Sequence, residues 1–201
     1  DAFDNTQAGF DALLTRMPEG ACWVMEASGP YHLRLAAYLH GQGRPCSVVN
    51  PLSVHRFAQM RLTRAKTDRG DARLIADYAA LAQPQPWSPP ALHISELAQI
   101  EGALDGLTKQ RTMVRNQLGA LSEQPFQSPA VRQSFEHLLE ELDREIKKLE
   151  RTQQELGRAH CEDRLQALLS IPGIGMETGL LLIAISHDFE RFEASAQVPG
   201  A

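Results

Sequence analysis

Three carboxylates in the first half of the chain are the side chains best suited to chemistry. Asp68 and Asp71 are spaced i, i+3, so a helix would place both on one face. Two negative charges held close together repel each other, and a divalent cation would supply the compensating charge. Glu26 directly follows the apolar run at residues 21–25. The carboxyl end of a parallel strand is where α/β folds place ligand and catalytic groups, so Glu26 is a third candidate.

Each carboxylate also has a simpler interpretation. Asp68 would serve equally well as a helix N-cap, with Asp71 in the first turn, where the helix macrodipole favours a negative charge. Glu26 would serve as a solvated glutamate at the end of a strand. Spacing alone does not choose between these interpretations and a metal site.

Basic residues surround the aspartate pair in an otherwise acidic chain of net charge −5. The six that lie between His55 and Arg73 are Arg56, Arg61, Arg64, Lys66, Arg69 and Arg73. Positive charge concentrated around a carboxylate pair predicts a polyanionic substrate at a metal site. Mg²⁺ there would activate a hydroxyl nucleophile and stabilise the leaving oxygen of a phosphodiester. The alternative is a solvated basic face.

The elements that must position these residues alternate between helix and strand over residues 1–83. The pattern predicts a helix after an N-cap at Thr6, strands at 21–25 and 46–49, and helices from Leu33 to Gly41 and from Asp68 to Leu81. Helices alternating with buried strands favour an α/β architecture with parallel pairing. Residues 84–91 (PQPWSPPA) contain four prolines, which predict a stiff linker and a domain boundary.

Residues 92–160 change to the period of a coiled coil. Apolar side chains recur in alternating steps of three and four, first at Leu97, Ile100, Leu104, Leu107, Val114, Leu118 and Leu121, and then at Phe135, Leu139, Leu142, Ile146, Leu149 and Leu156. Arg111 and Gln153 occupy the same seam and would disfavour some registers. The segment at 125–129 (PFQSP) interrupts the pattern, which predicts an antiparallel hairpin or an oligomerising coiled coil that forms a stalk.

Residues 161–201 contain the string Ile171 to Gly175 (IPGIG) between two apolar helical patterns. The string resembles a helix-hairpin-helix turn, in which backbone amides near Gly173 and Gly175 would hold a DNA phosphate. The alternative is a plain packing corner. The longest apolar run, 180–185, is too short to span a membrane. The three cysteines lack the spacing of a metal site or a disulfide framework, which fits a cytoplasmic protein.

Several strings taken together resemble one family. They are Asp4–Thr6 with Ala8–Phe10, Met25–His32 (MEASGPYH), Val49–Pro51, Lys66–Ala72 (KTDRGDA) and Ser170–Gly175. The set is similar to the DEDD transposases of bacterial insertion sequences, the group that includes the Piv-like invertases and the bridge-RNA-guided recombinases. The resemblance extends, in order, over nearly the whole chain.

The resemblance implies an α/β plus all-α protein. It would comprise a partial RuvC-like domain of ribonuclease-H fold (1–83), a linker (84–91), an antiparallel coiled-coil stalk (92–160), and the start of a helical transposase domain with its hairpin-like turn (161–201). Glu26, Asp68 and Asp71 match three of the four family carboxylates and are implied to bind Mg²⁺. The implied partners are insertion-sequence DNA, a structured guide RNA as in the guided members, and further copies of the chain bound through the coiled coil. No membrane is implied, and the implied location is the nucleoid of the bacterial cytoplasm.

Two departures from the family pattern shape the expectation for this chain. The strand that carries the family's first Asp and the stretch that carries its nucleophilic serine have no counterpart, so no serine here is assigned as the nucleophile. We therefore expect a fragment of a transposase or recombinase that is inactive alone and only marginally stable, because Ala21–Met25 would expose a strand edge. The rivals are a Holliday-junction-resolvase-like nuclease and a non-catalytic module for nucleic-acid binding and dimerisation.

Overall fold

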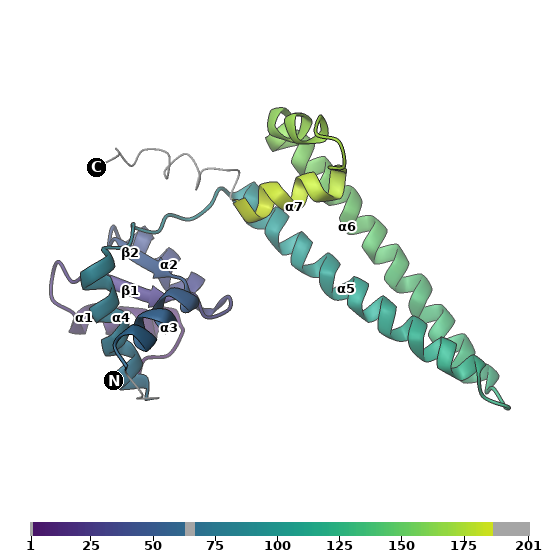
Figure 1. Cartoon of the computed structure of the whole chain (residues 1–201), viewed down its shortest axis with the longest axis horizontal. Helices are drawn as coiled ribbons and strands as arrows, with labels where there is room; N and C mark the ends of the chain where they lie inside the picture. The colour runs from purple at the N-terminus through teal and green to yellow at the C-terminus, as the bar shows by residue number, and fades with distance from the viewer. Residues whose placement is uncertain (1, 63–66, 187–201) are drawn as a thin grey trace. The chain divides into compact units, whose positions relative to one another are not determined.

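A computed structural model describes residues 2–62 and 67–186 of the chain, apart from the side chain of Asp68. The chain divides into two compact units, with the boundary between Pro89 and Pro90, inside the proline-rich segment. Figure 1 shows a mixed unit of short helices and strands and a second unit built on two long helices. No described helix is both long enough and apolar enough to cross a membrane.

The first unit alternates helices with two short strands. Its elements are α1 (Gln7–Arg16), β1 (Trp23–Glu26), α2 (Tyr31–Gly41), β2 (Cys46–Val49), α3 (Pro51–Met60) and α4 (Asp68–Ala82). The strands pair in parallel, with Trp23 opposite Cys46 and Glu26 opposite Val49. The predicted α/β alternation with parallel pairing is therefore confirmed, whereas the RuvC-like assignment stays a prediction.

Local capping and a small apolar core explain why these elements form. Thr6 accepts a hydrogen bond from the Gly9 amide and is the N-cap of α1, as predicted. Ala36 and Leu39 of α2 are fully buried against Cys46 of β2. The crossover helix therefore covers the sheet that ends in Glu26.

Helix α3 was not expected from the sequence. The Asn50 side chain accepts a hydrogen bond from the Leu52 amide at 2.8 Å, and Pro51 occupies the first turn. Phe57 is buried and meets the Tyr78 ring of α4 edge-on, with ring centroids 5.6 Å apart. The Asn-Pro pair that ends β2 therefore also begins a helix that packs on α4.

The proline-rich segment begins as part of the first unit. The Ser47 hydroxyl donates to the Pro84 carbonyl at 2.9 Å, and the Trp87 amide donates to the Cys46 carbonyl at 2.6 Å. The Trp87 indole packs on the core formed by α2 and β2 and meets His40 edge-on. Residues 84–87 therefore lie along β2, which is a correction to the expectation that the linker starts at 84.

The second unit is built on α5 (Leu92–Ser122) and α6 (Pro129–Leu169), which pack against each other. Arg111 pairs with Asp143 at 3.2 Å, and Gln153 donates to Glu101 at 2.7 Å. Glu101 lies before Arg111 on α5, whereas its partner Gln153 lies after Asp143 on α6, so the two helices run antiparallel. Of the two alternatives for the seam, the structure therefore has the hairpin within one chain, and both polar seam residues have a partner on the opposite helix.

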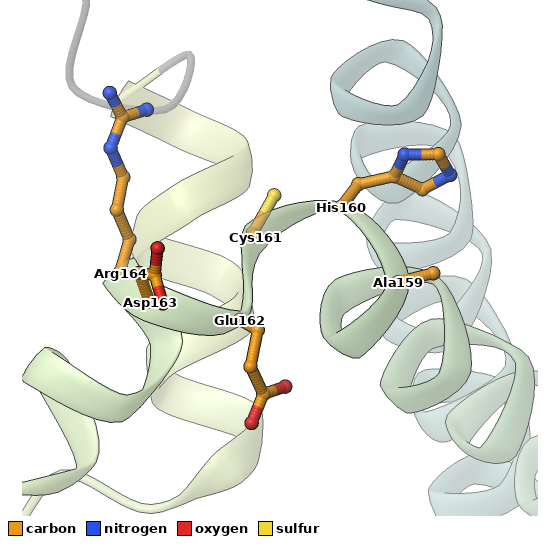
Figure 2. A pocket seen from close by; sticks show the side chains of 6 residues that line it. All are labelled: Ala159, His160, Cys161, Glu162, Asp163 and Arg164. Carbon is orange, nitrogen blue, oxygen red and sulfur yellow. The ribbon is translucent and has the colours of Figure 1, made fainter.

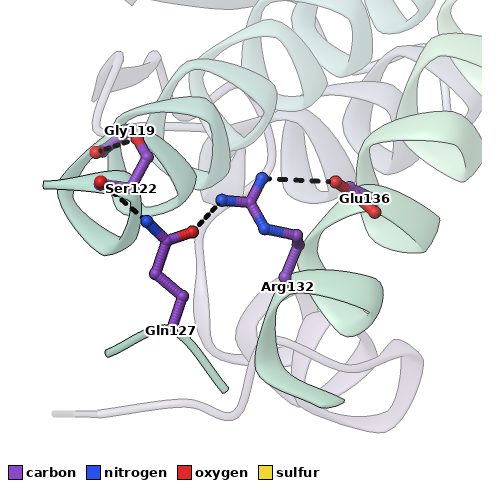
Figure 3. Close-up of polar contacts among 5 residues, drawn as sticks. All are labelled: Gly119, Ser122, Gln127, Arg132 and Glu136. Carbon is purple, nitrogen blue, oxygen red and sulfur yellow. Dashed lines mark hydrogen bonds and ion pairs between the residues drawn. The ribbon is translucent and has the colours of Figure 1, made fainter. Parts of the chain in front are cut away.

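A chain of polar contacts organises the turn at the tip of the hairpin (Figure 3). Ser122 donates to the Gly119 carbonyl at 2.6 Å, and Gln127 donates to the Ser122 carbonyl at 2.8 Å. Arg132 in the first turn of α6 binds Gln127 and pairs with Glu136 at 3.6 Å. These contacts satisfy backbone groups at the end of α5 and fix the reversal of the chain.

Helix α6 bends at Cys161, where the backbone leaves helical geometry with φ −131° and ψ 24°. Beyond this kink, α6 packs with α7 (Met176–Ser186) against the start of α5, and Leu97, Leu165 and Leu180 are fully buried there. A Cβ on Gly157 would lie 2.2 Å from Leu180 Cδ2, so a glycine is needed for α7 to approach α6 this closely.

Candidate functional site

Glu26 is the last residue of β1 and is half-buried. The amide of the next residue, Ala27, donates a hydrogen bond to the Val49 carbonyl at 3.0 Å. The Ser28 amide donates to the Glu26 carbonyl at 2.9 Å, so the chain turns directly after the strand. The Ser28 hydroxyl donates to Glu26 Oε1 at 3.4 Å. The predicted position of this carboxylate, at the carboxyl end of a parallel strand, is therefore confirmed.

The Asp-Asn-Thr string at residues 4–6 borders the loop that follows Glu26. Asn5 Nδ2 donates to the Tyr31 carbonyl at 3.1 Å, in the first turn of α2. A Cβ on Gly9 would lie 2.0 Å from the Asp4 carbonyl oxygen, so the chain folds tightly onto the start of α1. The string therefore has a local structural role, which is to join the entry to α1 with the loop between β1 and α2.

The aspartate pair lies at the start of α4, which contacts β1. The N-cap is Thr67, whose hydroxyl accepts from the Gly70 amide at 3.1 Å while its carbonyl accepts from the Asp71 amide at 2.8 Å. The alternative in which Asp68 caps the helix is therefore wrong, because Asp68 is the first helical residue. The Asp71 side chain is exposed to solvent.

The described side chains do not by themselves form a complete metal site. Among the described side chains, no group of three or more histidine, cysteine or acidic residues is placed to hold an ion. Since the Asp68 side chain lies outside that search, the ligand set of Glu26, Asp68 and Asp71 stays a prediction.

The basic residues around the pair fall into three groups. Arg56 on α3 and Arg69 and Arg73 on α4 are exposed. Arg61 pairs with Asp77 at 2.6 Å and stacks over the Phe57 ring at 5.5 Å, so it ties the end of α3 to α4. Arg64 and Lys66 lie outside the described residues. Sequence reasoning missed the contact of Arg61 because its partner lies 16 residues further along the chain.

The glycine turn predicted to bind phosphate lies in the second unit, between α6 and α7. Gly173 has a φ of +92°, and the Gly175 carbonyl accepts from the Gly179 amide at 2.9 Å as α7 begins. The predicted turn between two helices is confirmed. Phosphate binding by Gly173 and Gly175 stays a prediction.

A hollow of about 320 Å³ lies at the α6 kink and is lined by residues 159–164 (Figure 2). The side chains drawn there point in different directions and do not converge on one point. His160 turns to α5 and stacks on His93, with ring centroids 4.8 Å apart. The hollow therefore reflects the bend in the helix and not a set of convergent groups.

One shifted pKa marks the contact between α1 and α2. Tyr38 donates to Asp11 Oδ1 at 2.5 Å, and this hydrogen bond is the main cause that raises the pKa of Tyr38 above its ordinary value of 10.0. Phe10 packs against the same ring, with centroids 5.3 Å apart. Helix α1 is thereby held on α2, beside the loop that begins at Glu26.

Comparison with known proteins shows which family this chain resembles. A family model described as "Transposase", that of the IS110-type DEDD transposases, matches residues 1–126. The pilin gene-inverting proteins of Moraxella lacunata and Moraxella bovis are each 30% identical to this chain over 176 residues. The aligned part covers 86% of this chain and 52% of each relative, so the chain spans about half the length of these curated relatives. Because the family model covers more than half of the chain, including Glu26, Asp68 and Asp71, the chain belongs to the IS110 family of DEDD transposases.

Proposed function

We propose that this chain carries part of the acidic active site of a transposase or site-specific recombinase that cuts and exchanges strands of insertion-sequence DNA. The family match over residues 1–126 is the observation that carries the proposal. The position of Glu26 at the end of β1 supports it, as does the position of Asp71 in the first turn of a helix that contacts that strand. The proposed partner is bacterial DNA in the cytoplasm, and a guide RNA stays a prediction of the family resemblance.

The donor chemistry of these residues fits Mg²⁺. Carboxylate oxygens are the ligands this ion prefers, and it commonly binds one or two of them together with water and substrate phosphate. Glu26, Asp68 and Asp71 are the residues that would hold it. When bound, the ion would make the attacking hydroxyl more acidic and would stabilise the negative charge on the leaving oxygen. The half-buried setting of Glu26 would keep one ligand fixed, while the exposed Asp71 leaves room for a phosphate to enter.

The exposed cations would serve the substrate. A phosphate backbone could reach the exposed Arg56, Arg69 and Arg73. Contacts to phosphates increase the affinity for DNA without distinguishing one base sequence from another. Arg61 is already engaged by Asp77, so we assign it to holding α3 against α4. The two relatives invert a pilin gene by name, and a comparable rearrangement of DNA is proposed here.

A strand-cleavage assay with the protein that the natural gene encodes tests the proposal. We expect Mg²⁺-dependent cleavage of insertion-sequence ends that is lost in Glu26→Gln and Asp71→Asn. The matched control is Glu177→Gln, because Glu177 is also an acid in the first turn of a helix. Cleavage without a covalent protein–DNA adduct would indicate a resolvase-like nuclease. DNA binding unaffected by Mg²⁺ and by both substitutions, without cleavage, would leave only a binding module.

A further inference from the structure

Leu62 breaks two local rules at the end of α3. It follows the C-cap Arg61 with a φ of +53°, and its amide donates to the Gln59 carbonyl at 3.1 Å. This is the left-handed position that ends many helices, and glycine is the usual residue there because it has no Cβ. The Leu62 side chain is also 87% exposed, the highest value among the large hydrophobic side chains described in the first unit. Glycine or asparagine would suit the fold better, so folding does not explain this leucine.

A second exposed apolar side chain lies near a cation at the same end of α3. Met60, the last helical residue, is 67% exposed, and Arg56 one turn earlier is exposed as well. Residues four apart project from the same side of a helix, so Arg56 and Met60 are neighbours on the surface. The end of α3 therefore presents two apolar side chains, Met60 and Leu62, next to a positive charge.

A line of charged residues connects this end of α3 with the carboxylate site. On α4, Arg69, Arg73 and Asp77 follow one another in steps of four, so they lie along one side of the helix. Asp77 binds Arg61, the neighbour of Leu62, at 2.6 Å. The line therefore begins in the first turn of α4, where the aspartate pair lies, and ends next to Leu62. From Arg69 to Asp77 the helix rises about 12 Å, which is roughly three to four base steps of a stacked strand.

The size of the apolar area and the charges around it decide which partner fits. A stable protein interface buries about 800 Å² on each side, which two side chains do not provide. A DNA strand needs cations for its phosphates, and Arg56, Arg69 and Arg73 are exposed on the two helices. Proteins that unstack DNA insert leucine, methionine or similar apolar side chains between neighbouring bases. A glycine at position 62 could not fill that space.

We propose that Leu62, with Met60 beside it, is a wedge that enters between two bases of the DNA whose phosphates are held by Arg69 and Arg73. The inference rests on the proposed function, because it concerns DNA bound at the same carboxylate site. An inserted side chain kinks the duplex, and a kink a few base steps away would turn one phosphodiester toward the carboxylates. Leu62 would place the DNA and would take no part in the breaking of bonds.

The fluorescence of 2-aminopurine, which rises when this base is unstacked, tests the proposal. The probes are duplexes of the insertion-sequence ends with 2-aminopurine at one position after another, bound at saturation to the protein that the natural gene encodes. Divalent cations are left out so that no strand is cut. We expect a rise confined to the bases of one step. Leu62→Gly should reduce it at least about fivefold and keep the affinity for DNA within about threefold, because the phosphate contacts remain. Leu62→Met keeps an apolar side chain and should retain the rise.

Thermal unfolding of the variants separates this role from a structural one. Leu62→Gly should raise the melting temperature, because glycine relieves the left-handed backbone, so one change improves the fold and impairs the unstacking. The matched control is Gln83→Gly, since Gln83 is exposed and has a φ of +44° at the end of α4. This variant should be stabilised in the same way and keep the full rise. Leu62→Asn, with a polar residue that tolerates the left-handed backbone, must also reduce the rise.

Three results would overturn the proposal. They are DNA binding without a rise at any position, a rise that survives both Leu62→Gly and Leu62→Asn, and an equal loss in Gln83→Gly. In each of these cases the protein still binds DNA, so the proposed function stands. A protein that fails to bind DNA at all would contradict the proposed function together with the wedge.

Discussion

The two units of the chain place their polar residues by different rules. In the first unit, Glu26 and Thr67 lie where a strand ends or a helix begins, so their positions follow from short local strings. In the second unit, Arg111 and Gln153 lie inside a seam of period 3.5, and each finds its partner on the opposite helix. Local strings therefore position groups that remain accessible to a ligand, whereas a long repeat positions groups that are consumed in packing.

The largest effect that would sharpen this contrast is expected at the seam. Leu142 is 7% exposed, and Leu142→Asp should lower the free energy of unfolding of the helical unit by about 4 kcal/mol or more, through lost burial and an unpaired charge. Gln133→Asp, on an exposed position of the same helix, should change it by no more than about 0.5 kcal/mol. Urea unfolding followed by circular dichroism measures both. Equal stability of the two variants would mean that the seam does not hold the hairpin.

A smaller effect is expected where α7 meets α6. Gly157→Ala should destabilise the helical unit by about 1–3 kcal/mol, because the new methyl group would overlap Leu180 in a packed core. Gly102→Ala is the control on α5, since a Cβ there has open space, and it should stabilise the helix by roughly 0.5–1 kcal/mol. Opposite signs in thermal unfolding are the expected outcome, and stabilisation in both variants would contradict the close approach of the two helices.

The smallest effect concerns pH in the first unit. The folded pKa of Tyr38 is raised, so its contribution to stability is complete below the ordinary tyrosine value of 10.0 and is lost as pH rises through the folded value. Tyr38→Phe should therefore lower stability at neutral pH and reduce the loss above pH 10. Tyr31→Phe, at a side chain that is 73% exposed, is the control. Parallel pH profiles for the protein and Tyr38→Phe would argue against the bond to Asp11.

How far the sequence predicts each region depends on how local the signal is. Strand β2 was predicted residue for residue, and the alternating steps of three and four identified both long helices. No helix was predicted directly after the strand at 46–49, although Asn50 followed by Pro51 is a helix-start signal. The kink at Cys161 and the pairing of Arg61 with Asp77 depend on packing between distant segments, which periodicity does not report.

The candidate site was predicted in position but not in detail. Glu26 lies at the end of a strand and Asp71 in the first turn of a helix, as the sequence predicted. An N-cap role for Asp68 was one of two alternatives, and the preceding Thr67 fills that role through its hydroxyl. Capping and metal binding compete for the same short acidic side chains, so the sequence alone could not separate them.

The measurement that tests the central claim most directly is a titration of the chain with Mn²⁺, a spectroscopic substitute for Mg²⁺, followed by electron paramagnetic resonance. The carboxylate site predicts saturable binding that is weakened at least about tenfold by Glu26→Gln and by Asp71→Asn. Glu177→Gln, in the first turn of α7, should leave the binding unchanged. Binding that is absent, or that is equal in all three variants, would contradict a metal site formed by these carboxylates.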